Sequence, residues 1–314
     1  MKTAFVFPGQ GSQKVGMLRE SATQNPLVKS TFNEASEVLG YDLWQLCQEG
    51  PEERLNSTEV TQPAILTASV ALWRCWQSAE GLTPAMVAGH SLGEYSALVA
   101  AGSLDFADAV ALVQKRALAM QAAVPQGQGS MAAILGLDDA QVQVACESAA
   151  QGQVVSAVNF NAPGQVVIAG HRDAVERAIL ACKEAGAKRA MALPVSVPSH
   201  CTLMFPAADV MAQALAVTQV RDAVIPVVQN VSAEATSDAS VIADNLVKQL
   251  VSPVLWTDSV RSLAATGCNT LIECGPGRVL GGLVKRIDRQ LTCLPLETPE
   301  QLQAALMQMK ITTT

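Results

Sequence analysis

The chain has 314 residues and a net charge of −7, and 49% of its residues are hydrophobic while only 16% are charged. A chain of this length can bury a large core, and the negative charge argues against a nucleic-acid partner, because phosphate binding needs a basic surface. No apolar stretch reaches the roughly 18 residues of a membrane span, and the apolar start is too short for a signal peptide, so we expect a cytoplasmic protein with no membrane partner.

The first expected element is a buried strand over residues 4–7, which a Pro-Gly-Gln-Gly turn ends. A helical pattern follows from near Lys14. A second short apolar strand, residues 86–89, leads into Ser91, and a helix rich in small residues follows over 92–101. Strands that alternate with helices in this way favour a mostly parallel sheet with both faces covered.

Residues 89–93, Gly-His-Ser-Leu-Gly, match the G-x-S-x-G elbow that exposes a nucleophilic serine between a strand and a helix. The two glycines allow the backbone to turn sharply, and the free N–H groups at the start of the helix favour a nearby negative charge. Ser91 is therefore the candidate nucleophile. The other interpretation is a glycine-bracketed turn in which Ser91 only caps the helix.

A serine nucleophile also needs N–H donors for the oxyanion that forms on its substrate. We expect these donors to be the backbone N–H of Leu92, next to the serine, and that of Gln10, which two glycines flank. The alternative for the Gly-Gln-Gly segment is a tight glycine turn or a weak phosphate loop, although it lacks the spacing of either nucleotide fingerprint.

A further helix is expected over residues 106–120, with Asp105 as its N-cap. Arg116 falls on the apolar face of this helix, which places a guanidinium in the core. An unpaired guanidinium there is costly, because it does not deprotonate. Arg116 is therefore a bidentate clamp for a substrate carboxylate, a member of a structural ion pair, or a side chain that extends to the surface.

Residues 125–129, Pro-Gln-Gly-Gln-Gly, are the expected hinge into a separate unit. The segment 127–196 is predicted to form an inserted ferredoxin-like subdomain, because its elements follow the order β-α-β-β-α-β. The core is then discontinuous and comprises residues 1–126 and 197–314. The strands expected in the insertion are 130–137, 154–160, 165–169 and 188–195, and the helices are 138–150 and 173–185.

After the insertion the larger pattern resumes. Its expected helices cover residues 203–217, 240–250 and 256–266, and its expected strands cover 225–230 and 270–273. The segment Gly275-Pro276-Gly277 is expected to open the last major helix.

The sequence offers three histidines as the base for Ser91. His90 lies inside the elbow, where it points away from the serine hydroxyl, and His171 is expected to cap a surface helix. His200, in a loop that prolines keep irregular, is the candidate base, although without the elbow it would be an ordinary polar loop residue. No aspartate or glutamate stands out as the third member of a triad.

Eight cysteines occur with no CxxC pair and no metal-ligand spacing, which predicts reduced thiols and no metal site. Cys201 adjoins His200, but adjacent residues rarely face each other. We therefore expect Cys201 to be a buried structural thiol.

Six motifs stand in the chain in a specific order. They are Phe7-Pro-Gly-Gln-Gly-Ser-Gln13, Gly89-His-Ser-Leu-Gly-Glu-Tyr-Ser96, Gln114-Lys-Arg116, Asn159-Phe-Asn-Ala-Pro-Gly-Gln165, Val197-Pro-Ser-His200 and Glu273-Cys-Gly-Pro-Gly277. Together they resemble the bacterial malonyl-CoA:acyl carrier protein transacylase family over nearly the whole chain. The resemblance implies an α/β-hydrolase-like core that carries a ferredoxin-like subdomain, in agreement with the expectation above.

By position, the resemblance implies that Ser91 is the nucleophile, His200 the general base and acid, and Arg116 the clamp for the malonyl carboxylate. The implied reaction is ping-pong: malonyl-CoA acylates the serine, and the phosphopantetheine thiol of acyl carrier protein then takes the malonyl group for fatty acid synthesis. No cofactor is expected, because the CoA thioester is itself a substrate. A monomer is expected.

The resemblance also implies supporting roles. Gln10 and Leu92 would form the oxyanion hole, and Gln249 would orient His200 through its main-chain carbonyl. Gln62 and Gln165 would line the substrate pocket.

Surface residues bear on the partner. Phe205 stands where related sequences are expected to carry a basic residue that contacts CoA or the carrier protein. Arg278, Lys285, Arg286 and Arg289 are expected to share one helical face, which suits either docking of an acidic carrier or simple solvation.

Three other functions are compatible with the elbow. A serine hydrolase such as a thioesterase uses the same motif, but its usual order is serine, then an acid, then a late histidine. A non-catalytic module that binds carrier proteins is the second. The third is a related transacylase that loads malonyl groups for a malonate decarboxylase or a polyketide system.

Overall fold

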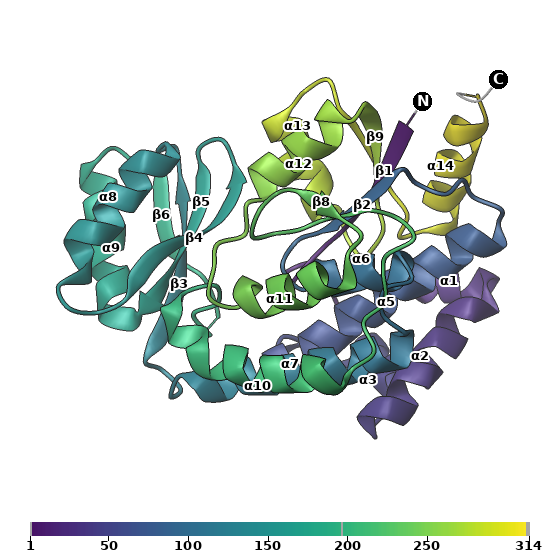
Figure 1. The fold of residues 1–314 in the computed structure, drawn as a ribbon, viewed down its shortest axis with the longest axis horizontal. Coiled ribbons are helices and arrows are strands. Elements are labelled where there is room, and N and C mark those ends of the chain that lie inside the picture. The colour runs from purple at the N-terminus through teal and green to yellow at the C-terminus, as the bar shows by residue number, and fades with distance from the viewer. Residues whose placement is uncertain (1, 196, 312–314) are drawn as a thin grey trace.

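The computed structural model describes residues 2–195 and 197–311, and Figure 1 shows two layered units side by side. The larger unit is built on a six-stranded sheet with the order β10-β9-β1-β2-β7-β8, in which neighbouring strands are parallel except for the pair β7 and β8. Its strands are β1 (Lys2–Phe7), β2 (Met86–Gly89), β7 (Val227–Val228), β8 (Ala235–Thr236), β9 (Cys268–Glu273) and β10 (Thr292–Pro295).

Helices cover both faces of this sheet. Before the second unit the chain forms α1 (Arg19–Gln24), α2 (Pro26–Leu39), α3 (Leu43–Glu49), α4 (Glu52–Leu55), α5 (Thr58–Ser78), α6 (Gly93–Ala100) and α7 (Phe106–Ala123). After it, a 3₁₀ turn (Thr202–Met204) leads into α10 (Phe205–Val217), and α11 (Ala239–Gln249), α12 (Trp256–Ala265), α13 (Val279–Ile287) and α14 (Pro299–Ile311) follow.

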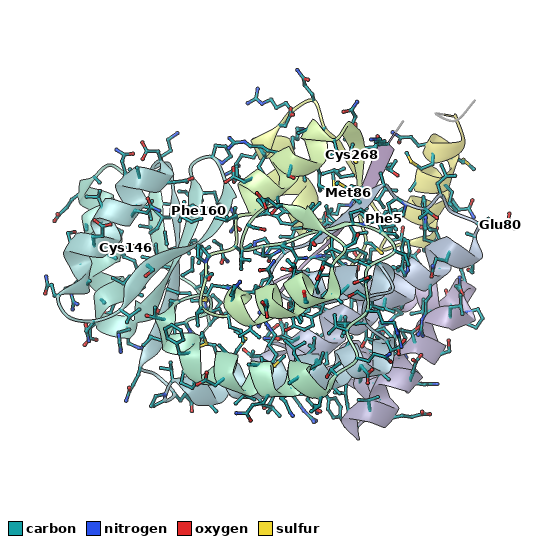
Figure 2. All side chains as sticks on the ribbon, viewed as in Figure 1. Phe5, Glu80, Met86, Cys146, Phe160 and Cys268 are labelled. Atoms are coloured by element: carbon teal, nitrogen blue, oxygen red, sulfur yellow. The ribbon has the colours of Figure 1, made fainter. Side chains whose placement is uncertain are left out.

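The first strand shows why the sheet is covered twice. Side chains alternate across a strand, so Phe5 and Phe7 face the core shared with α2, α5 and α7, whereas Ala4 and Val6 face the core shared with α12 and α13. All four side chains are buried. Figure 2 shows Phe5 and Met86 within the densely packed larger unit.

The smaller unit contains a four-stranded antiparallel sheet with the order β4-β5-β3-β6, and two helices lie against it (Figure 1). Its elements are β3 (Gly129–Leu135), α8 (Asp139–Ala150), β4 (Val155–Ala162), β5 (Gln165–His171), α9 (Arg172–Glu184) and β6 (Arg189–Ala192). It has its own apolar core, which includes Cys146 and which Phe160 packs against (Figure 2). This is the topology of a ferredoxin-like fold.

The predicted fold class is confirmed: a mostly parallel sheet with helices on both faces is joined to a ferredoxin-like unit. The boundaries at residues 127 and 196 stay predictions; the second falls on residue 196, outside the described residues. None of the helices within 2–195 and 197–311 is long and apolar enough to cross a membrane.

Several local predictions were wrong. Helix α1 begins only at Arg19 rather than near Lys14, and the strand expected over 225–230 is reduced to β7. The helix after Gly277 is not the last major one, because β10 and α14 follow it. The position of Asp105 as the N-cap residue of α7 was predicted correctly, although its side chain makes no capping hydrogen bond and its carboxylate pairs with Arg221 at 2.7 Å.

Candidate active site

Ser91 lies at a sharp turn between β2 and α6, with a φ of 52° in the left-handed region. Both flanking glycines are required by close backbone contacts: a Cβ on Gly89 would lie 1.9 Å from the carbonyl carbon of Gly93, and one on Gly93 would lie 2.0 Å from the oxygen of Phe7. A left-handed serine costs free energy, so surrounding contacts must hold it.

Two buried side chains supply those contacts, and the sequence did not indicate either of them in this role. Asn230 accepts a hydrogen bond from the Ser91 N–H at 2.7 Å and donates one to the oxygen of Gly89 at 2.6 Å. The Gln249 amide donates to the oxygen of Ser91 at 3.0 Å. The strained turn is therefore fixed on both sides of the serine.

His200 is buried and lies with its Nε2 atom 2.7 Å from Ser91 Oγ. Its Nδ1 atom lies 2.7 Å from the main-chain oxygen of Gln249. Because a carbonyl oxygen can only accept, Nδ1 carries the proton and Nε2 is free to accept the serine proton. Burial, reinforced by the positive charge of Arg116, lowers the pKa of His200 to about 3, which keeps the imidazole neutral at pH 7.

Arg116 is 1% exposed, as its position on the apolar face of α7 predicts. Nη1 donates to Gln62 Oε1 at 2.7 Å and Nη2 donates to Gln249 Oε1 at 2.9 Å, while Nη2 also lies 3.4 Å from Ser91 Oγ. Within the described ranges no carboxylate lies at salt-bridge distance from Arg116, and its Nε has no hydrogen-bond partner. The guanidinium is thus held by neutral groups and its Nε keeps an unused donor, although Arg116 does not itself line the cleft that opens onto the serine.

A cleft of about 250 Å³ opens onto Ser91 and His200 between the two units. Gln10 and Gln165 also line it. Much of the remaining wall is apolar and comes from the smaller unit, the loop before His200 and α13: Met131, Val167, Leu193, Val195, Val197, Val279, Leu280 and Leu283. A larger, more open groove of about 740 Å³ is lined in part by Arg286 and contains neither catalytic candidate, so we place the site in the smaller cleft.

The other predicted residues lie at different depths. Leu92 is 1% exposed at the N-cap of α6, and Gln249 is buried beside the serine. Gln62 is buried and does not line the cleft; it contacts Arg116 and, at 3.3 Å, Gln10.

The two remaining histidines have structural contacts. His90 Nε2 donates to Asn161 Oδ1 at 2.7 Å, and its ring packs against Trp256. His171 is the N-cap residue of α9, as expected, but its side chain makes no capping hydrogen bond, because its Nδ1 accepts from the Val154 N–H instead.

The cysteines make no bridges. All eight are unpaired, and no group of residues in 2–195 and 197–311 has the arrangement of a metal site. Cys201 is buried, its thiol donates to the Pro198 oxygen at 3.2 Å, and burial raises its pKa to about 11, so it is an inert structural thiol, as expected.

The four basic residues do not share one helical face, so that prediction was wrong. Arg278 stands at the N-cap of α13, and Lys285 and Arg286 occupy its last turn. The helix ends where Asp288 becomes extended, which leaves Arg289 in the following turn. All four are exposed, and Arg286 donates to Gln165 Oε1 at 2.9 Å. Phe205, the first residue of α10, is 55% exposed.

Comparison with known proteins places the chain among acyltransferases. The profile of the acyl transferase domain family matches residues 4–298. The chain is 62% identical over 305 residues to the malonyl CoA-acyl carrier protein transacylase of Salmonella typhimurium, covering 97% of this chain and 99% of that protein. It is 47% identical over 310 residues to the protein of the same name from Bacillus subtilis, covering 98% of each.

Solved structures agree. The malonyl CoA-acyl carrier protein transacylase of Coxiella burnetii superposes with a TM-score of 0.97 at 51% identity, covering 98% of this chain and 97% of that one. A malonyl-transacylase solved in complex with its type II polyketide acyl-carrier protein also gives a TM-score of 0.97, at 55% identity, covering 98% of this chain and all of that one.

Proposed function

The chain belongs to the acyl transferase domain family, and we propose that it transfers a malonyl group from malonyl-CoA to the phosphopantetheine thiol of an acyl carrier protein. One observation carries the proposal: Ser91 Oγ lies 2.7 Å from His200 Nε2 and 3.4 Å from Arg116 Nη2. A nucleophile, a base and a carboxylate-binding cation thus meet at one oxygen atom. The names of close relatives support the same reaction.

In the first half-reaction, His200 Nε2 takes the hydroxyl proton while Ser91 Oγ attacks the thioester carbonyl. The tetrahedral intermediate collapses, the C–S bond breaks, and the imidazolium returns its proton to the departing CoA sulfur. In the second half-reaction the carrier thiol gives its proton to His200 and attacks the malonyl ester. The C–O bond to Ser91 then breaks, and the imidazolium returns the proton to Ser91 Oγ, which restores the serine. The Gln249 carbonyl keeps His200 in the tautomer that both steps need.

The backbone N–H groups of Gln10 and Leu92 form the proposed oxyanion hole. Leu92 directly follows the nucleophile at the start of α6, where the helix dipole favours an anion. The loop that carries Gln10 is packed onto the elbow so closely that a Cβ on Gly9 would lie 2.5 Å from the oxygen of His90. This close packing of the two loops supports the assignment of both N–H groups to one oxyanion hole.

Arg116 is the proposed clamp for the malonyl carboxylate. A malonyl group on Ser91 carries its carboxylate a few bonds from Oγ, within reach of a guanidinium that already lies at 3.4 Å. Gln62 and Gln249 hold that guanidinium in place, so we assign Gln62 a positioning role rather than direct substrate contact. Gln165 lines the cleft and is the proposed polar contact for the pantetheine arm.

We further propose that an acidic carrier protein docks on the basic residues at α13. Arg278, Lys285, Arg286 and Arg289 are exposed there, and Val279, Leu280 and Leu283 of the same helix line the cleft. The reaction needs no cofactor, because the CoA thioester supplies the activated acyl group. We propose a monomer in the cytoplasm, where unpaired cysteines are usual.

Intact-protein mass spectrometry tests the function. After mixing with malonyl-CoA, the wild-type chain should gain the mass of one malonyl group, and Ser91→Ala should gain none. A malonyl adduct that persists on Ser91→Ala would refute the assignment. Addition of holo carrier protein should then move the adduct to the carrier rather than release free malonate, which separates transfer from hydrolysis.

A further inference from the structure

A second ionisable side chain lies under the elbow and has no part in the reaction described above. Glu94, in the first turn of α6, is 1% exposed. Its Oε2 accepts hydrogen bonds from the Gln249 amide at 2.8 Å and from the Asn230 N–H at 3.2 Å. Its Oε1 has no hydrogen-bond partner in the part of the chain that the structure describes. Burial raises the pKa of Glu94 to about 7. A half-satisfied buried carboxylate is costly, which points to a purpose other than stability.

The contacts of Gln249 connect this carboxylate to the proposed clamp. The amide oxygen of Gln249 accepts from Arg116 Nη2 at 2.9 Å, and its amide nitrogen donates to Glu94 Oε2 at 2.8 Å. One planar amide therefore lies between a buried cation and a buried carboxylate. Glu94 and Arg116 interact electrostatically across it without direct contact.

Tyr95 and Glu94 are the two groups whose electrostatic interactions favour the charged form of Arg116, and of the two only Glu94 is a carboxylic acid. Its direct partners are amide oxygens and a hydroxyl. Tyr95 faces the guanidinium with its ring at 5.7 Å, but burial raises the pKa of that phenol to about 12, so it is neutral at pH 7. In its ionised form, which its pKa of about 7 leaves well populated at neutral pH, Glu94 is the anion that limits how strongly Arg116 attracts a further carboxylate.

We propose that Glu94 is a positioning residue that moderates the hold of Arg116 on the malonyl carboxylate, so that the malonyl-enzyme forms readily yet is discharged to the second thiol. The inference rests on the proposed function. If Arg116 holds the malonyl carboxylate equally strongly in the acyl-enzyme and in the transition state of discharge, turnover does not increase. If it holds the carboxylate more strongly in the acyl-enzyme, discharge becomes slower. A negative charge on Glu94, one amide away, weakens the attraction between Arg116 and the malonyl carboxylate without occupying the guanidinium N–H groups that bind the substrate.

A purely structural role makes a different prediction. Glu94 also secures Asn230 and Gln249, both of which hold the serine turn. If Glu94 did only this, its loss would slow acyl transfer by the same factor for every donor. The charge-balancing role instead predicts an effect confined to acyl groups that carry a carboxylate.

The test is Glu94→Gln, which keeps the shape and one carbonyl acceptor but removes the charge. Acylation and discharge are measured separately by rapid-quench mass spectrometry with malonyl-CoA and with acetyl-CoA. We expect discharge of the malonyl-enzyme to slow and the malonyl KM to fall, each by about tenfold, which is the scale of one charge acting at short range inside a protein. Discharge of the acetyl-enzyme should stay within about twofold of wild type.

Equal changes for the two donors, or faster malonyl discharge, would overturn the inference. Glu94→Asp keeps the charge and should retain a malonyl-to-acetyl ratio close to wild type; a tenfold change in that ratio overturns the inference even if Glu94→Gln fails to fold. Glu34→Gln removes the carboxylate partner of another arginine, Arg74, remote from the cleft, and serves as the matched control. Absence of any malonyl adduct on the wild-type chain would instead refute the proposed function itself.

Discussion

Replacing Arg116 by alanine provides the sharpest test of the site, because it should change which acyl group is transferred rather than whether transfer occurs. Arg116 contributes no atom to proton transfer, which runs between Ser91 Oγ and His200 Nε2 at 2.7 Å. Its guanidinium lies 3.4 Å from the same oxygen, where it can bind only an acyl group that carries a free carboxylate. Malonyl transfer should therefore fall steeply while acetyl transfer is largely retained.

The expected size follows from the burial of the pair. Breaking a buried, hydrogen-bonded charge pair costs about 2–5 kcal/mol, and each 1.4 kcal/mol is a factor of ten, so kcat/KM for malonyl-CoA should fall by about 30- to 4,000-fold. The substitution also leaves the amide oxygens of Gln62 and Gln249 without a hydrogen-bond donor, at a cost of about 1–3 kcal/mol each in folding stability. This loss affects malonyl and acetyl transfer equally.

The assay compares kcat/KM for malonyl-CoA and acetyl-CoA with the same holo carrier protein, after thermal unfolding has shown that the variant is folded. Arg221→Ala is the matched control. Arg221 is exposed and pairs with Asp105, which stands at the start of α7, the helix that carries Arg116. Arg116→Lys should reduce malonyl transfer to an intermediate extent, since it keeps the positive charge but loses the two parallel N–H donors of the guanidinium. A loss of equal size for malonyl and acetyl transfer by Arg116→Ala would refute the clamp.

Two further predictions concern the base and the docking surface. Because its pKa is lowered, His200 stays neutral as the pH falls, so kcat/KM for acetyl-CoA should not decline as the pH is lowered through 6.5. Arg116→Ala should shift the pH at which kcat/KM begins to decline upward, because it removes a positive charge that lowers the imidazole pKa. A decline of the wild-type kcat/KM that begins at pH 6.5 or above contradicts this. The double variant Arg278→Glu and Lys285→Glu should raise the KM for carrier protein by about fivefold or more while leaving the rate of serine acylation by malonyl-CoA within about twofold, and an unchanged KM would place the docking surface elsewhere.

The parts of the site that sequence could predict are those whose causes are local. The elbow was predictable because the contacts of Gly89 and Gly93, at 1.9 and 2.0 Å, admit no side chain, and this need appears directly in the motif. The burial of Arg116 was predictable because a helix repeats its faces every 3.6 residues.

The supporting network was not predictable from local pattern. Asn230 reaches a turn 139 residues earlier in the chain, and the Gln249 amide reaches the same turn across 158 residues. Neither residue has a spacing that marks it. The length of strand β7, two residues, was overestimated for a related reason. Its pairing with β2 and β8 determines that length, not its own sequence.

The absence of an acidic third triad member has a physical explanation in this geometry. His200 Nδ1 meets the Gln249 main-chain oxygen at 2.7 Å, and the side chain of the same residue meets Arg116 at 2.9 Å. A carboxylate beside Nδ1 would raise the imidazole pKa, pair with the guanidinium and repel the carboxylate of a malonyl substrate. A carbonyl fixes the tautomer with no net charge, and the Glu94 carboxyl group lies one amide away from Arg116. If Arg116 is the clamp, an aspartate at the His200 contact would thus impair this site for malonyl groups.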